Sequence, residues 1–257
     1  MSIRMGLMYP DLLNLHGDKA NVTAFERVAS ALEVPFETVR YDDPGAGINF
    51  SGLDLLLFPP GETVEAGYLA EVLADQKEGF AGYIEEGGIM AVIGTSLAVF
   101  ARHTRRKRGD PFDGLGIIGA ELTELRTAYS NDAVLITDSF GKEMEIVGGQ
   151  IQMLKISRDE GTEPLGRAEY GYGNDGGGFE GIRVKNFIHT NFLGPVFVKN
   201  PWFAEELIRL ACERRGVPVK GESPAYGLER RSNEEIRRFI RMKIEKYDKT
   251  RLYNGED

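Results

Sequence analysis

A short stretch near residue 93 has the layout of a nucleophile elbow. Residues 88–97 combine an apolar run, which predicts a buried strand, with a glycine-containing turn and the start of a helix. In such an elbow a strained turn lifts one side chain above the sheet edge, where it can attack a substrate. We expect Ile93 to be the lifted residue and Gly94 and Thr95 to complete the turn. Isoleucine has no nucleophilic atom, so the layout indicates an enzyme scaffold whose chemistry is gone.

Two hydroxyl side chains follow the turn, and each has two interpretations. Thr95 or Ser96 could replace the missing nucleophile, but a hydroxyl needs a base nearby, and the sequence places no histidine there. Because both residues stand at the start of a helix, we expect them to cap free backbone N–H groups.

Bulk composition narrows the function classes. The chain has 257 residues and a net charge of −9, which disfavours general binding to nucleic acids. No apolar run approaches the ~20 residues that cross a bilayer. Cys212 is the only cysteine, which favours a reducing, cytoplasmic setting. The histidines are scattered without zinc-like spacing and no phosphate-gripping loop occurs, so we expect no metal and no cofactor.

Alternating patterns predict an α/β fold with a mostly parallel central sheet flanked by helices. Strands are expected at 3–8, 36–40, 53–58 and 89–93, and helices at 21–32, 64–85 and 201–215. The second half adds β-rich segments at 115–147 and 167–197, both expected to form short strands. A continuous apolar run such as 53–58 is typical of a strand buried on both faces.

The C-terminal region differs in composition from the rest. We expect a main domain over 1–217 and, over 218–257, a linker followed by a charged helix near 233–247. Ile236, Phe239, Ile240 and Ile244 form its apolar stripe. Such a helix can lie across its own domain or dock a partner.

Two segments resemble one known family. They comprise Tyr9-Pro10-Asp11-Leu12-Leu13-Asn14-Leu15-His16-Gly17-Asp18 with Asn21, and Gly171-Tyr172-Gly173-Asn174, Glu180-Gly181, Lys185-Asn186, Thr190, Gly194-Pro195 and Lys199-Asn200-Pro201. Both are similar to the cobyric-acid-synthase-like class I glutamine amidotransferases, and most of all to amidotransferase subunits of lipid II isoglutaminyl synthase. The likeness spans residues 3–215 and implies the class I amidotransferase (flavodoxin-like) fold.

The resemblance also implies a reaction whose residues are missing. In the family an elbow cysteine attacks the glutamine amide, a histidine activates it, and ammonia passes to a partner synthetase. Here Ile93 takes the place of the cysteine and Leu193 that of the histidine. The glycine-rich oxyanion turn is replaced by Pro59, Pro60 and Gly61, and proline has no backbone N–H to donate. The sequence therefore predicts a degenerate pocket.

His189 is the histidine nearest to the expected base position. Four residues along a strand span ~13 Å, so we expect its side chain to miss the elbow and to be structural, with a displaced base as the lesser alternative. Cys212 lies in a predicted helix, where a small buried apolar residue is the usual role.

Polar residues follow the first strand. Asp11, Asn14, Asp18 and Asn21 could line a polar site or a partner surface, since ligands gather at the carboxyl ends of parallel strands. Alternatively, these side chains hold the loop through hydrogen bonds to the backbone.

Three functions remain open. The first is a non-catalytic, regulatory or binding subunit that partners a Mur-ligase-type synthetase acting on cell-wall precursors. The second is a working glutamine amidotransferase in peptidoglycan or cobalamin-type amidation. The third is a standalone binder of a small ligand, which would need an apolar cavity near Ile93 and Leu193.

Overall fold

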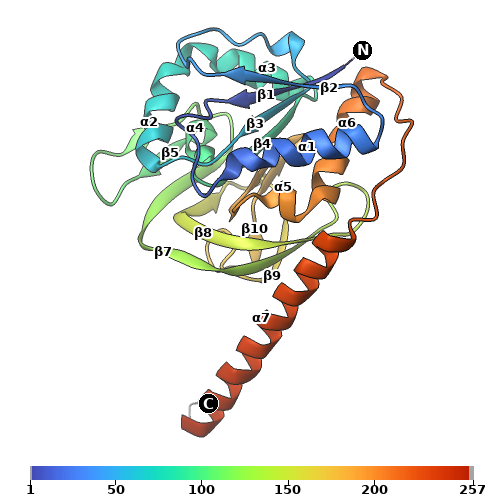
Figure 1. Cartoon of the computed structure of the whole chain (residues 1–257). Helices are drawn as coiled ribbons and strands as arrows, with labels where there is room; N and C mark the ends of the chain where they lie inside the picture. The colour runs from blue at the N-terminus through green and yellow to red at the C-terminus, as the bar shows by residue number, and fades with distance from the viewer. Residues whose placement is uncertain (1, 255–257) are drawn as a thin grey trace.

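The computed structural model describes residues 2–254, with side chains described for 2–246. Within this part the chain forms two sheets and flanking helices (Figure 1). The first sheet has the order β11–β12–β4–β3–β1–β2. Its strands are β1 (Ile3–Met8), β2 (Phe36–Tyr41), β3 (Leu55–Phe58), β4 (Ile89–Ile93), β11 (Ile182–Val184) and β12 (Phe187–Thr190). Only the β11–β12 pair is antiparallel, so the prediction of a mostly parallel central sheet is confirmed.

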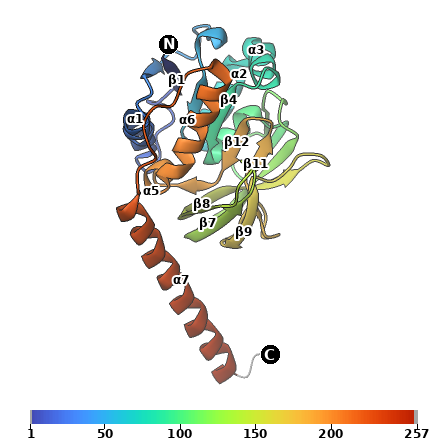
Figure 2. The same ribbon diagram turned by 90° about the vertical axis from the view of Figure 1, so that its right-hand side faces the viewer.

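Helices cover both faces of this sheet (Figure 2). The covering helices are α1 (Asn21–Ala31), α2 (Thr63–Val72), α3 (Lys77–Glu85), α4 (Leu97–Phe100), α5 (Val196–Lys199) and α6 (Pro201–Arg215), while α7 (Gly227–Asn254) packs on the second sheet. The apolar faces of α1 and α6 pack on one side and those of α2, α3 and α4 on the other. Every side chain of β3 is fully buried, and burying each large apolar side chain contributes about 1.5–3 kcal/mol.

The second sheet is mostly antiparallel and packs below the first (Figure 2). It contains β5 (His103–Arg105), β6 (Phe112–Asp113), β7 (Ala120–Thr137), β8 (Met144–Arg158), β9 (Gly166–Tyr170), β10 (Phe179–Glu180) and β13 (Phe192–Leu193). The prediction of only short strands over 115–147 is wrong, because β7 and β8 are 18 and 15 residues long and form one long hairpin. The strands after residue 166 are short, as predicted.

The single helix predicted over 64–85 is broken into α2 and α3 by a 3-10 turn, Ala74–Gln76. Gln76 accepts a hydrogen bond from the Ile48 backbone N–H at 2.9 Å and donates one to the Ala46 carbonyl at 3.3 Å. These contacts tie the turn to a distant loop, an interaction that helical periodicity cannot indicate.

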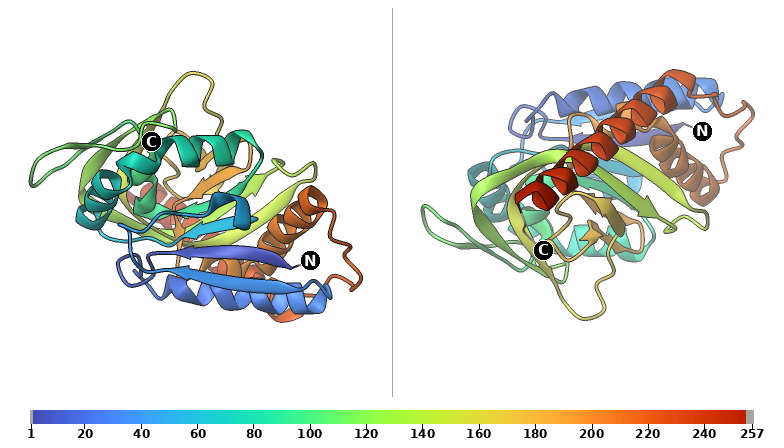
Figure 3. Two further views of the ribbon diagram at one scale, coloured as in Figure 1. Left: turned by 90° about the horizontal axis from the view of Figure 1, so that it is seen from above. Right: turned by 90° about the horizontal axis from the view of Figure 1, so that it is seen from below.

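Helix α7 begins earlier than predicted, at Gly227, and crosses the second sheet before extending away from the body (Figures 1 and 3). Ile236 and Ile240 pack against Val134 and Val147 of the sheet. The predicted four-residue stripe is wrong in part: Phe239 is 58% exposed and Ile244 is 43% exposed. Among the described residues, no helix is both long enough and apolar enough to cross a membrane.

Candidate functional site

The sharp turn between strand β4 and the next helix lies at Gly94. Ile93 ends β4 in an extended conformation, with φ −115°, and is fully buried in the core. Gly94 has a φ of +57° and opens the 3-10 turn Gly94–Ser96. A positive φ costs little for glycine and is strained for other residues. The geometry therefore places the apex of the elbow one residue after Ile93.

A side chain at position 94 would point toward the residue predicted at the base position. A Cβ atom built on Gly94 would lie 3.0 Å from Leu193 Cδ2 and 3.2 Å from Pro60 Cβ. Leu193 is 5% exposed and belongs to the same apolar core as Ile93. The structure thus brings three of the predicted pocket positions together, and the side-chain atoms that face position 94 are apolar.

His189 reaches the elbow, contrary to the expectation that it misses it. Its Nε2 lies 3.0 Å from the Gly94 carbonyl oxygen. A carbonyl only accepts, so Nε2 carries the proton. The ring is fully buried, Nδ1 has no partner among the described residues, and burial lowers the pKa of His189 to about 4. A neutral imidazole that donates to a backbone carbonyl anchors the turn between the parallel strands β4 and β12.

The hydroxyls after the turn bind the neighbouring loop and do not cap the helix. The Thr95 hydroxyl donates to the Gly61 carbonyl, and the Ser96 hydroxyl donates to the Pro59 carbonyl. Neither residue makes a side-chain cap, so the capping prediction is wrong. The sequence could not reveal that this loop lies beside the turn.

The same loop presents acceptors where an oxyanion would need donors. Pro59 and Gly61 turn their carbonyls toward the elbow hydroxyls, and the Pro60 carbonyl accepts the Leu15 N–H at 3.0 Å. An oxyanion hole requires backbone N–H groups aimed at the developing charge. Pro59 and Pro60 have none.

The cavity between the elbow turn and strand β8 is very small. The cavity lined by Gly94, Thr95, Gln152 and Asn191 has a volume of about 10 Å³. That is at the lower limit for a single water molecule, whereas small-molecule pockets measure ~300–1,000 Å³. Strand β8 supplies much of its wall and packs directly against the turn. In this conformation the space cannot admit glutamine.

Sequence comparisons find relatives of this chain among known proteins. No family model matches the chain. It is 29% identical over 211 residues to lipid II isoglutaminyl synthase (glutamine-hydrolyzing) subunit GatD of Staphylococcus aureus, covering 82% of this chain and 84% of that protein. The corresponding subunit of Streptococcus pneumoniae is 25% identical, with 85% and 84% covered. A probable cobyric acid synthase of Methanocaldococcus jannaschii is 27% identical over 88% of this chain and 48% of its own length.

The chain is a homologue of these glutamine amidotransferases. Solved structures agree in fold. PurLQS from Thermotoga maritima has a TM-score of 0.53 at 13% identity, with 83% of this chain and 99% of that chain covered. A glutamine amidotransferase from the same organism has a TM-score of 0.50 at 10% identity, with 96% and 98% covered. The predicted amidotransferase fold is therefore confirmed.

The polar residues after β1 divide into two groups in this amidotransferase homologue. Asp11 and Asn14 are exposed. Asp11 forms ion pairs with Lys19 at 3.0 Å and Arg40 at 3.1 Å. Both Lys19 and Asp11 are solvated, and exposed pairs of this kind contribute little to stability.

Asp18 and Asn21 are fully buried and lie side by side. The Asn21 amide donates to Asp18 at 3.2 Å, and its oxygen accepts the Phe197 backbone N–H at 2.8 Å. Burial raises the pKa of Asp18 to about 6. These two side chains fasten the loop after β1 to the start of α5, which supports the structural interpretation for them.

One buried carboxyl, Glu180, lies in the second segment that resembles the family, and no role was predicted for it. Glu180 is fully buried, accepts the Asn191 backbone N–H at 2.6 Å and lies 3.3 Å from the Thr190 hydroxyl. Burial raises the pKa of Glu180 to about 7, and the hydrogen bonds only partly offset it. Its place in the segment that resembles the family was the available signal, but its burial arises from contacts between distant strands.

Proposed function

We propose that this protein is a non-catalytic, amidotransferase-like subunit that partners a Mur-ligase-type synthetase. The observation that carries the proposal is the hydrocarbon at the elbow: Gly94 has no side chain, and Leu193 and Pro60 occupy the space next to it. Glutamine hydrolysis by this route needs an activated thiolate and an adjacent base. The positive φ at Gly94 supports this residue as the equivalent of the nucleophile position. With Ile93 as the equivalent, the conclusion is the same, because neither residue can attack an amide.

The remaining thiol cannot replace the missing one. Cys212 is 1% exposed inside α6, and burial raises the pKa of its thiol. A raised thiol pKa lowers the thiolate fraction and hence the reactivity. Cys212 packs in the apolar core that α6 shares with the first sheet.

The partner is inferred from the relatives. The two bacterial relatives are named as subunits of a glutamine-hydrolysing synthase, and the similarity covers most of this chain. A subunit that has lost hydrolysis can keep its docking surface and position or regulate the synthetase. A synthetase gene beside the gene for this chain would support this partnership.

A glutaminase assay tests the proposal. Ammonia release from L-glutamine is measured with the purified chain alone and with the co-expressed synthetase, and the Staphylococcus aureus relative serves as the positive control. We expect no release above background in either case. Turnover near 1 s⁻¹, an ordinary enzymatic rate, would refute the proposal and establish the alternative, a working glutamine amidotransferase, which the similarity to glutamine-hydrolysing relatives supports.

Variants that introduce a cysteine and a histidine at the elbow test which position corresponds to the nucleophile. Gly94→Cys with Leu193→His is compared with Ile93→Cys with Leu193→His in the same assay. Any recovered release should appear only in the Gly94 variant, because Ile93 points into the core. The proline-containing loop limits the recovery, since Pro59 and Pro60 still lack N–H donors.

A further inference from the structure

The outward face of α7 combines apolar and cationic side chains. Leu228, Phe239 and Met242 are 73%, 58% and 54% exposed. Leu228 and Phe239 are eleven residues apart, or three helical turns, and Met242 follows one turn later, so the three share one side of the helix. Ile240 and Ile236 occupy a different side and pack on the sheet. This helix is therefore apolar on two sides, and the body covers one of them.

Positive charge surrounds the exposed side. Residues 227–254 contain nine Lys and Arg against five Asp and Glu, in a chain whose net charge is −9. Arg231 lies one turn after Leu228, is exposed, and makes no ion pair with the described residues. Arg238 is also exposed and pairs with Glu235 at 3.4 Å. An acidic partner surface fits this face, because it would neutralise Arg231, which the described residues leave without an ion pair.

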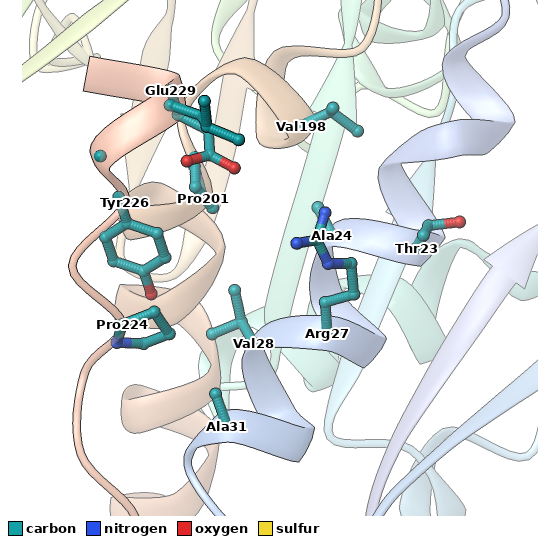
Figure 4. Close-up of a pocket in the computed structure, with 12 residues that line it drawn as sticks. Thr23, Ala24, Arg27, Val28, Ala31, Val198, Pro201, Pro224, Tyr226 and Glu229 are labelled. Atoms are coloured by element: carbon teal, nitrogen blue, oxygen red, sulfur yellow. The ribbon is translucent and has the colours of Figure 1, made fainter. Parts of the chain in front are cut away.

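A groove continues the exposed face at the start of α7 (Figure 4). It has a volume of about 400 Å³ and lies between α1, the start of α6 and the segment that leads into α7. Val28, Pro201, Pro224 and Leu228 give it an apolar lining. Arg27 also lines it and makes no ion pair with the described residues. The groove can accept an apolar side chain, and both the Arg27 cation and the Glu229 carboxylate lie beside that space.

We propose that α7 and this groove form the docking surface for the synthetase, and that they bind an amphipathic segment of it with acidic residues flanking apolar ones. This inference rests on the proposed function and specifies its partner contact. Two copies of α7 packed together would bring like charges into contact, which disfavours self-association through this helix. Over the part of α7 whose side chains are described, the apolar side consists of three large residues, which suits a helix-in-groove contact better than the broad face of a membrane-bound helix.

Binding measurements with the full chain test the inference. The probe is a purified Mur-ligase-type synthetase from the organism that makes this chain, and its Kd is measured by calorimetry. We expect Phe239→Glu with Met242→Glu to weaken binding more than tenfold without changing the unfolding temperature, since both side chains are exposed. A matched control, Val64→Glu with Tyr68→Glu, alters an equally exposed apolar pair, 55% and 50% exposed, on α2 and should change the Kd less than twofold.

A charge-reversal variant tests the electrostatic part of the docking surface separately from its apolar part. Arg231→Glu should weaken binding at low salt by at least threefold, and the effect should shrink at high salt because the interaction is screened. Equal effects at both salt concentrations would contradict an acidic partner surface.

The remaining outcomes of the binding experiment distinguish failure of this inference from failure of the proposed function. If the unaltered chain binds the synthetase and the α7 variants bind equally well, this inference fails and the proposed function stands. If the unaltered chain forms no complex, both fail. The inference would also be overturned if the chain dimerised or bound phosphatidylglycerol vesicles and the α7 variants abolished that interaction while the synthetase complex remained.

Discussion

At the scale of single residues, the elbow region uses its polar groups to hold the backbone together. Thr95 and Ser96 donate to the loop beside them, and His189 donates to the Gly94 carbonyl. Each of these groups would otherwise be an unsatisfied buried donor, which costs ~1–3 kcal/mol. The hydrogen bonds that fix the turn thus use the hydroxyl groups of Thr95 and Ser96 and one ring nitrogen of His189.

Glu180 should make the stability of this protein depend on pH. Its pKa is raised from 4.5 to about 7 by burial, so the folded state binds a proton more tightly than the unfolded state. Its contribution is therefore fully present below pH ~4.5 and is lost as the pH rises to ~7. We expect the free energy of unfolding of the natural chain to fall relative to Glu180→Gln across this window, by on the order of 3 kcal/mol.

Denaturant titrations at several pH values measure this difference. Glu71→Gln, a change at an exposed position on α2, is the control and should follow the natural chain at every pH. Parallel pH profiles for the natural chain and Glu180→Gln would show that the carboxyl at position 180 ionises freely in the folded protein.

At the scale of elements, helix α7 is attached to the body on one side only. Ile240 is 4% exposed against Val134 and Val147, and Arg237 forms ion pairs with Glu145 and Glu169. The neighbouring Phe239 points away from the body. A one-residue step along a helix turns the side chain by about 100°, which separates these two roles.

Substitutions at two adjacent positions of α7 should therefore differ in their effect on stability. Ile240→Ala removes buried methyl groups and should lower the free energy of unfolding by about 2 kcal/mol. Phe239→Ala removes an exposed ring and should change it by less than ~0.5 kcal/mol. Chemical denaturation of the full chain measures both, and equal losses would contradict the described packing of the helix.

At the scale of the whole molecule, the two sheets together close the elbow. Strand β8 of the second sheet packs on the turn that follows β4 of the first, and the cavity between them has a volume of about 10 Å³. Leu193 in β13 pairs with Gly149 of β8, which holds its side chain against the apex. The small volume of this cavity is therefore set by how the two sheets meet.

L-glutamine should consequently leave the thermal stability of the chain unchanged. A ligand that binds only the folded state raises Tm in proportion to its occupancy, and this cavity cannot hold one. We expect no shift of Tm up to millimolar glutamine, measured by calorimetry, while the Staphylococcus aureus relative serves as the reference. A saturable rise in Tm would show that the elbow opens to admit the substrate.

The sequence by itself determined the alternation of strands and helices, the parallel sheet and the absence of a cysteine at the elbow. Local periodicity and residue identity carry that information, as the bounds of β1 and α6 show. Only the tertiary structure decided that Gly94 is the apex, that His189 binds its carbonyl, and that Phe239 faces outward. These depend on which segments meet in space: His189 and Gly94 are 95 positions apart, and no local pattern encodes such a contact.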